Sequence, residues 1–276
     1  MKIAIIGLGL IGGSLAKAIK AFTHHEVWGA DLDENVLAAA IRENSIDGQL
    51  TDEILKTCDL ALIALFPKAV VKYISDHRDV FNPNGLIIDC GGVKGPVMDG
   101  IDAFRHEHTW QFIGGHPMAG REFCGYFNSQ AELFKNASMI LTPYEDTPSE
   151  AMDKAEEFFL SLGFGRIKVT TPSFHDQMIA YTSQLAHVVS SAYVKGELVS
   201  SQMGFTAGSF GDMTRVARLN EDMWTQLFMS NKAPLLHELN ALIRRLEEYR
   251  DALADEDAEG MRQLLKTGRE IKEGLN

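Results

Sequence analysis

Cysteine is scarce in this sequence. Its 276 residues include three cysteines, Cys58, Cys90 and Cys124, at wide and irregular spacing. An odd number of cysteines without a CxxC pair fits neither a disulfide framework nor a zinc site. We therefore expect no bound metal, and we expect the protein in a reducing compartment, the cytoplasm.

Basic residues and long apolar runs are also lacking. Lys and Arg number 26 against 38 Asp and Glu, which gives a net charge of -12. This charge disfavours nucleic acid and anionic membranes as partners, but a local arginine can still bind an anionic small molecule. No apolar run is long enough to span a bilayer. The glycines within residues 1–20 argue against a signal peptide there.

The sequence does contain a regular alternation of short apolar segments and helical segments up to about residue 172. Such alternation predicts βαβ units and a mainly parallel sheet. The length suits two domains. We predict an α/β domain over residues 1–172 and an all-α domain over residues 173–276. The strands are expected at 2–6, 26–30, 59–65, 85–90, 111–114, 137–142 and 166–170, and the helices at 13–22, 34–44, 68–78, 95–106 and 148–162.

Two long helices are predicted in the second domain, over 174–200 and 222–253. Apolar residues recur along the second of them at alternating spacings of four and three, which is a heptad-like pattern. A core helix within its own domain and a subunit interface explain this pattern about equally well. We expect a homodimer formed through the C-terminal helices. The residues of the pattern are Leu235, Leu239, Leu242, Leu246, Tyr249 and Leu253.

A glycine-rich turn, GLGLIG, follows the first predicted strand and opens the first predicted helix. Gly7 permits the tight turn, Gly9 lets a pyrophosphate approach the backbone, and Gly12 lets helix and strand pack closely. The free N–H groups of the helix start, with Leu10 and Ile11, then face the phosphates. This context predicts a Rossmann-type dinucleotide site.

Asp31 ends the second predicted strand, about 20 residues after the glycines, where a carboxylate accepts hydrogen bonds from the adenosine ribose. A carboxylate there repels a 2′-phosphate, so we expect NAD as cofactor rather than NADP. Asp33 is interpreted as a cap of the following helix.

His116 in the stretch FIGGHPMAG is the best candidate for a proton-transfer residue, because histidine titrates near neutral pH and the stretch follows a predicted strand. His187 and Arg215 are candidates in the second domain. Arg215 could hold a carboxylate in a bidentate fork. Each has an ordinary alternative: His187 as a structural helix residue, Arg215 paired with Asp212, and Trp224 in the core.

The segments GLGLIGGSLA, DCGGVKG, GGHPMAG, HDQMIAYTSQLAHVV and GSFGDMTRVA resemble, in order and spacing, the prephenate/arogenate dehydrogenases of tyrosine biosynthesis. The resemblance runs from about residue 1 to residue 240. It implies NAD-dependent oxidative decarboxylation of prephenate to 4-hydroxyphenylpyruvate and CO2.

The resemblance assigns roles to single residues. His116 matches the histidine that accepts the proton of the substrate's ring hydroxyl. Arg215 matches the arginine that binds a carboxylate, His187 matches a second pocket histidine, and Gly208 matches a glycine beside the substrate. Trp224 is expected in the same pocket.

Three positions depart from the family pattern. Gly92 stands where many members have a serine that orients the catalytic histidine, and we place Gly92 beside the cofactor. Arg121 follows HPMAG where a small polar residue is common, and an arginine there favours the keto acid prephenate over arogenate, which carries an ammonium group. Gln184 replaces another common pocket histidine.

Two other functions remain open on sequence grounds. One is the same reaction on arogenate. The other is a catalytically weak NAD-binding dimeric sensor, which Gly92 favours and the intact His116 and Arg215 disfavour. A β-hydroxyacid or 6-phosphogluconate type of dehydrogenase is disfavoured, because the second half lacks the helical K-x-x-x-N pattern of those enzymes.

Overall fold

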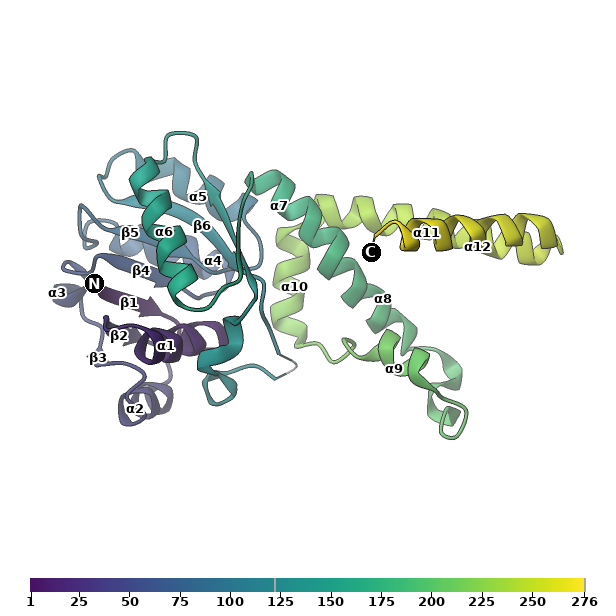
Figure 1. The fold of residues 1–276 in the computed structure, drawn as a ribbon, viewed down its shortest axis with the longest axis horizontal. Coiled ribbons are helices and arrows are strands. Elements are labelled where there is room, and N and C mark those ends of the chain that lie inside the picture. The colour runs from purple at the N-terminus through teal and green to yellow at the C-terminus, as the bar shows by residue number, and fades with distance from the viewer. Residues whose placement is uncertain (122, 276) are drawn as a thin grey trace. The chain divides into compact units, whose positions relative to one another are not determined.

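The computed structural model describes residues 1–121 and 123–275 (Figure 1). It divides into two compact units, Met1–Asn231 and Lys232–Asn276, which are described separately below. The first unit therefore includes helices that the sequence assigned to the second domain. The boundary at residue 172 stays a prediction.

The first unit contains one sheet of eight strands in the order β3-β2-β1-β4-β5-β6-β7-β8. All neighbours are parallel except β6 and β7, which are antiparallel. This confirms the mainly parallel sheet. The strands are β1 (Lys2–Ile6), β2 (Glu26–Ala30), β3 (Gly48–Gln49), β4 (Leu60–Ile63), β5 (Leu86–Asp89), β6 (Gln111–Pro117), β7 (Ser138–Pro143) and β8 (Arg166–Val169).

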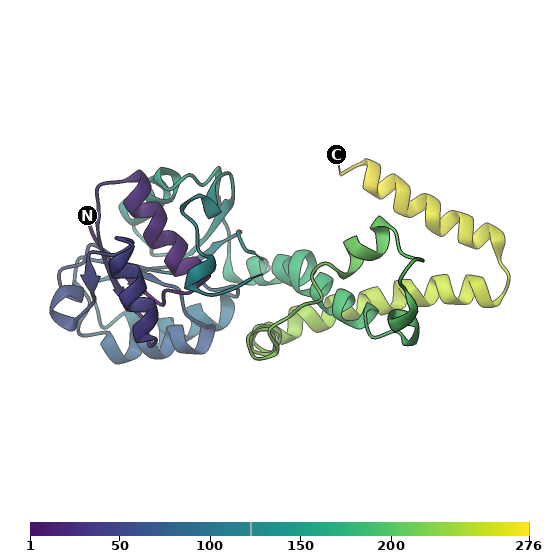
Figure 2. The same cartoon turned by 90° about the horizontal axis from the view of Figure 1, so that it is seen from below.

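Helices cover both faces of this sheet, which explains why its inner strands are apolar at every position. Ile3 and Ile5 of β1 face one core, and Ala4 and Ile6 face the other. The first core packs under α1 (Leu10–Phe22), α2 (Glu34–Arg42) and α6 (Ser149–Ser161), and the second under α3 (Asp52–Leu55), α4 (Pro67–His77) and α5 (Gly95–Arg105). Figures 1 and 2 show α1 and α4 on opposite sides of the sheet.

Strand β6 is longer than the sequence predicted and contains His116, which we had placed in a loop. Close packing inside the sheet requires glycine at both Gly114 and Gly115. A Cβ atom at Gly114 would lie 2.3 Å from Oγ1 of Thr142, and one at Gly115 would lie 2.5 Å from the carbonyl oxygen of Asp89.

The predicted helix over 174–200 is shorter and is interrupted. It consists of α7 (Pro172–Ile179), a π-helical turn (Ala180–Gln184) and α8 (Leu185–Tyr193), and a separate 3-10 turn follows at Glu197–Ser201. Gly196 falls between the two, where its poor helix propensity explains the break. The remaining helices described in this unit are α9 (Gly208–Thr214), α10 (Glu221–Ser230) and two 3-10 turns at Tyr126–Asn128 and Ala131–Phe134.

The second unit is a pair of helices, α11 (Lys232–Ala254) and α12 (Ala258–Glu273), which pack against each other (Figure 2). The helix predicted over 222–253 is thus two helices, since α10 ends at Ser230. Two residues of the heptad-like pattern, Leu246 and Leu253, are 57% and 70% exposed. Within the described residues, no helix is both long enough and apolar enough to cross a membrane.

Candidate active site

The glycine turn has the geometry of a nucleotide-binding loop. Gly7 has φ +87°, a conformation that side chains disfavour. A Cβ atom at Gly12 would lie 1.8 Å from the carbonyl oxygen of Gly7, so α1 packs directly on the turn. Around Gly9, in contrast, nothing lies within 4 Å of a Cβ position. The turn is therefore tightly packed at Gly12, where the helix contacts it, and leaves space at Gly9, where a phosphate would approach.

Helix α1 begins at Leu10, followed by Ile11, and its N-cap residue Gly9 supplies no side-chain hydrogen bond. The first N–H groups of the helix are thus available to an anion. Asp31, at the end of β2, accepts hydrogen bonds from the backbone N–H groups of Leu8 at 2.7 Å and Asp33 at 3.0 Å. Its carboxylate is fixed beside the turn. The residues present fit a dinucleotide.

Asp33 caps helix α2, as its position in the sequence predicted. Its side chain accepts a hydrogen bond from the backbone N–H of Asn35 at 2.9 Å.

The carboxyl ends of β1, β4, β5 and β6 meet at one edge of the sheet, where ligands of such folds bind. Gly7 follows β1, and Gly92 comes shortly after β5. His116 lies near the end of β6, with its side chain half-buried. A Cβ atom at Gly92 would lie 4.0 Å from both Cε1 and Nε2 of His116. The glycine turn, Gly92 and His116 therefore share this edge.

A second histidine holds the ring of His116. Nδ1 of His116 lies 2.9 Å from Nε2 of His175 on α7, and Nδ1 of His175 lies 2.7 Å from Oδ1 of Asp176. The side chain of His175 is fully buried. Asp176 also accepts hydrogen bonds from the backbone N–H groups of Lys94 and Gly95, each at 2.8 Å. The three side chains form one hydrogen-bonded chain that ends at the start of α5.

Lys94 places a buried positive charge near His116. Its ammonium group pairs with the buried carboxylate of Asp89 and donates to the carbonyl oxygen of Gly115. Burial, followed by the proximity of His175 and Lys94, lowers the pKa of His116 well below 6.5. His116 is therefore neutral at neutral pH and able to accept a proton.

The other candidate residues gather around α8, α9 and α10. The ring of His187 stacks on Trp224 with centroids 4.0 Å apart, and its Nδ1 donates to the carbonyl oxygen of Ser183 at 2.8 Å. Burial lowers the pKa of His187, and the nearby charge of Arg215 lowers it further against the opposing effect of that hydrogen bond. Arg215 is exposed at the end of α9, and Gly208 is exposed at its start.

Helix α10 joins this group to the His116 group. Trp224 and Leu227 lie on the same face of α10, one turn apart. Cδ2 of Leu227 lies 3.4 Å from a Cβ position at Gly92, which adjoins His116. Helix α10 thus contacts both groups: Leu227 lies near Gly92, and Trp224 stacks on His187.

Gln184 is not a pocket residue in this structure. It is buried in the π-helical turn, and its Oε1 accepts a hydrogen bond from Nδ2 of Asn231 at 2.8 Å. The same amide of Asn231 donates to the carbonyl oxygen of Asp176 at 2.8 Å. Gln184 and Asn231 therefore support the backbone that carries Asp176.

Arg121 follows the end of β6 and is exposed, with a long hydrogen bond of 3.4 Å to the carbonyl oxygen of Asn128. Its guanidinium remains open to solvent on that loop.

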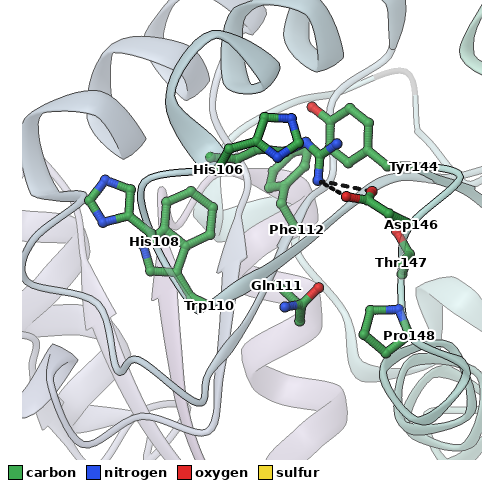
Figure 3. Close-up of a pocket in the computed structure, with 10 residues that line it drawn as sticks. His106, His108, Trp110, Gln111, Phe112, Tyr144, Asp146, Thr147 and Pro148 are labelled. Atoms are coloured by element: carbon green, nitrogen blue, oxygen red, sulfur yellow. Dashed lines mark hydrogen bonds and ion pairs between the residues drawn. The ribbon is translucent and has the colours of Figure 1, made fainter.

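A separate hollow lies at the other edge of the sheet, where β6 begins and β7 ends (Figure 3). The guanidinium there, Arg105, is paired with Asp102 and Asp146, so this hollow offers no free charge for an anion.

His175, Asp176 and Lys94 were missed by reasoning from the sequence. The signal was present, because a His-Asp pair opens the segment HDQMIAYTSQLAHVV and Lys94 ends the stretch DCGGVK. The His-Asp pair does not indicate its partner His116, which comes from another part of the chain. Lys94 pairs with Asp89 of its own stretch, but that stretch does not show that the pair lies near His116.

Two family models match this sequence. Residues 15–168 match the prephenate dehydrogenase nucleotide-binding domain, and residues 171–267 match the prephenate dehydrogenase dimerization domain. Together they cover helix α1 from Leu15 onward, the β6 histidine and the helices that carry His175, His187 and Arg215.

Individual relatives agree with these models. A prephenate dehydrogenase from Bacillus subtilis is 30% identical over 99% of this chain and 76% of its own length. A cyclohexadienyl dehydrogenase from Zymomonas mobilis is 30% identical over 99% of this chain and 95% of its own length. The crystal structure of Aquifex aeolicus prephenate dehydrogenase with hydroxyphenyl propionate and NAD+ shares the fold, with a TM-score of 0.87, 22% identity, and coverage of 100% of this chain and 98% of the other.

Proposed function

The chain belongs to the prephenate dehydrogenase family, and on that premise we propose that it catalyses the NAD-dependent oxidative decarboxylation of prephenate to 4-hydroxyphenylpyruvate and CO2. The observation that carries the proposal is the position of the His116 ring, which a hydrogen bond to His175 holds near the end of β6. Its ring is held at the ligand edge of the sheet with a lowered pKa, so it is a neutral base at neutral pH.

In the proposed reaction, Nε2 of His116 accepts the proton of the hydroxyl group on C4 of the substrate ring. NAD+ held at the glycine turn would supply the acceptor for the hydride that leaves C4. The bond between C1 and the ring carboxylate breaks, CO2 leaves, and its electron pair completes the aromatic ring. The resulting phenolate oxygen takes the proton back from His116, so the residue ends the cycle neutral.

Arg215 holds a carboxylate of the substrate in this proposal. It is exposed, and it is close enough to His187 for its charge to lower the pKa of that residue. A guanidinium fork matches a carboxylate in geometry and charge. His187, Trp224 and Gly208 line the substrate side of the pocket.

The dinucleotide is held by Gly7, Gly9 and Gly12, by the first N–H groups of α1 at Leu10 and Ile11, and by Asp31. Its pyrophosphate would be held over Gly9, where nothing lies within 4 Å of a Cβ position. The carboxylate of Asp31 receives the ribose hydroxyls and repels a 2′-phosphate, which favours NAD over NADP. Gly92 lies beside His116, and in this proposal it also borders the cofactor.

The substrate is proposed to be prephenate rather than arogenate because Arg121 extends from the loop after β6. Its positive charge attracts a keto acid side chain and repels the ammonium group of arogenate. The relatives include a prephenate dehydrogenase and a cyclohexadienyl dehydrogenase, so their names do not decide between the two substrates.

We propose a homodimer formed through the C-terminal helices. The second family model describes a dimerization domain, and apolar side chains such as Leu246 and Leu253 are exposed there. The three cysteines carry free thiols, which suits an enzyme of the cytoplasm.

The test is NADH formation by the purified protein with prephenate or arogenate, each with NAD+ and with NADP+. Fast reduction of NAD+ by prephenate supports the proposal. Activity on arogenate alone would overturn the role of Arg121 and keep the chemistry. Binding of NAD+ without turnover of either compound would favour the sensor function instead.

A further inference from the structure

The hydrogen-bonded chain His116–His175–Asp176 has a direction that the donors and acceptors determine. A carboxylate only accepts hydrogen bonds, so Nδ1 of His175, at 2.7 Å from Asp176, carries a proton. In a neutral His175, Nε2 is then the unprotonated nitrogen. Nδ1 of His116, at 2.9 Å from that nitrogen, must be the donor. A neutral His116 is left with its lone pair on Nε2.

The anchor of this chain is rigid. Asp176 receives two backbone N–H groups at the start of α5, an 11-residue helix whose positive dipole end favours a carboxylate. The side chain of His175 is fully buried and that of Asp176 is 8% exposed. Neither group can exchange its partner for water without a large movement.

The opposite side of the His116 ring faces Gly92. A Cβ atom at position 92 would lie 4.0 Å from Nε2 and from Cε1 of His116. The ring nitrogen of His116 that lies nearest to position 92 is thus Nε2 and not Nδ1. In this chain the orientation of His116 must come from His175, since Gly92 has no side chain to supply it.

We propose that His175 and Asp176 are positioning residues: Asp176 fixes the tautomer of His175, and His175 fixes His116 with Nδ1 protonated and Nε2 open to accept the substrate's proton. This inference rests on the proposed function only for its catalytic consequence. The tautomer itself is a property of the free protein.

The first experiment measures that tautomer. Nitrogen-15 NMR of the histidine-labelled protein near neutral pH distinguishes protonated from unprotonated ring nitrogens, and loss of signals in His116→Gln assigns the residue. We expect Nδ1 of His116 protonated in the wild type and the Nε2-protonated form in His175→Phe, which removes the acceptor. An Nε2-protonated His116 in the wild type overturns the inference, even if His175→Phe fails to fold.

The second experiment uses steady-state kinetics with prephenate and NAD+. We expect His175→Phe and Asp176→Asn to lower kcat about 100-fold, the scale of a misdirected general base, with KM for prephenate and the affinity for NAD+ changed less than about threefold. His175→Gln, whose amide oxygen can still accept from Nδ1 of His116, should recover at least about tenfold of that loss.

His108→Gln is the matched control, because His108 lies at the opposite edge of the sheet with a side chain 12% exposed. It should leave kcat unchanged. Equal losses of kcat, NAD+ affinity and thermal stability in the His175 variants, without rescue by Gln, would show a structural role only. If prephenate is not oxidised while the tautomer is as expected, the proposed function fails and the positioning chain stands.

Discussion

Nδ1 of His116 on β6 and Nε2 of His175 on α7 lie 2.9 Å apart, although 59 positions separate the two residues in the sequence. This contact gives the candidate base a fixed partner at Nδ1, whereas Gly92 has no side chain that could supply one. It also explains why a glycine at that position is compatible with an active site.

A serine in place of Gly92 should therefore have little effect. Gly92→Ser places its Cβ atom 3.4 Å from Cδ2 of Leu227, which is tight but adjustable because the contact is the end of a flexible side chain. We expect kcat with prephenate and NAD+ to change less than about threefold, since His175 already holds the ring. Gly92→Ala controls for the added volume. A tenfold or greater rise in kcat for serine but not alanine would show that His116 is poorly oriented in the wild type.

The alternation of strands and helices was predictable because it depends on local periodicity. The strand from Leu86 to Asp89 and the helix from Gly95 to Arg105 agree with prediction within a residue or two. The end of β6 was not predictable, because Gly114 and Gly115 are there for contacts with Thr142 and Asp89 that only the folded sheet creates.

The same limit applies to the site. The nucleotide turn is contiguous, so its glycines identify it. His116 was found from its own stretch of sequence. The pairing of Asp176 with the N–H groups of Lys94 and Gly95 joins positions more than 80 residues apart, and no local pattern indicates it.

The pH dependence of the reaction should report the lowered pKa of His116. Burial, His175 and Lys94 all disfavour its protonated form, which lowers the pKa well below 6.5. The base is active when neutral, so kcat/KM should stay level from neutral pH down to about 6.5 and fall only as pH drops through the lowered pKa. The measurement is kcat/KM for prephenate against pH. A decline that is half complete at or above pH 6.5 would contradict this environment for His116.

Two glycines of the nucleotide turn should respond differently to alanine. Gly12→Ala puts a Cβ atom against the carbonyl oxygen of Gly7 and should lower the free energy of unfolding by about 3 kcal/mol. Gly9→Ala meets no atom within 4 Å and has a φ of -69°, so the fold should persist. Its methyl group instead occupies the space for the pyrophosphate, and we expect NAD+ affinity to fall at least about tenfold.

Urea unfolding and calorimetric titration with NAD+ separate these two effects. Normal NAD+ affinity in Gly9→Ala would place the pyrophosphate elsewhere. Full stability in Gly12→Ala would mean that α1 can shift away from the turn.

Arg215→Ala tests the substrate side of the site. Loss of a charged, bidentate hydrogen-bond partner costs about 2–3 kcal/mol, which corresponds to a rise in KM for prephenate of roughly 30- to 150-fold. The affinity for NAD+ should not change, because Arg215 lies at the end of α9 and the glycine turn lies at the start of α1. Arg215→Lys is the matched control: it keeps the charge but loses the bidentate geometry, so its KM should lie between those of wild type and alanine.

If the affinity for NAD+ falls while KM rises, Arg215 contacts the cofactor and the proposed orientation of the substrate is wrong. If neither changes, another cation holds the carboxylate, and Arg121 becomes the residue to substitute next.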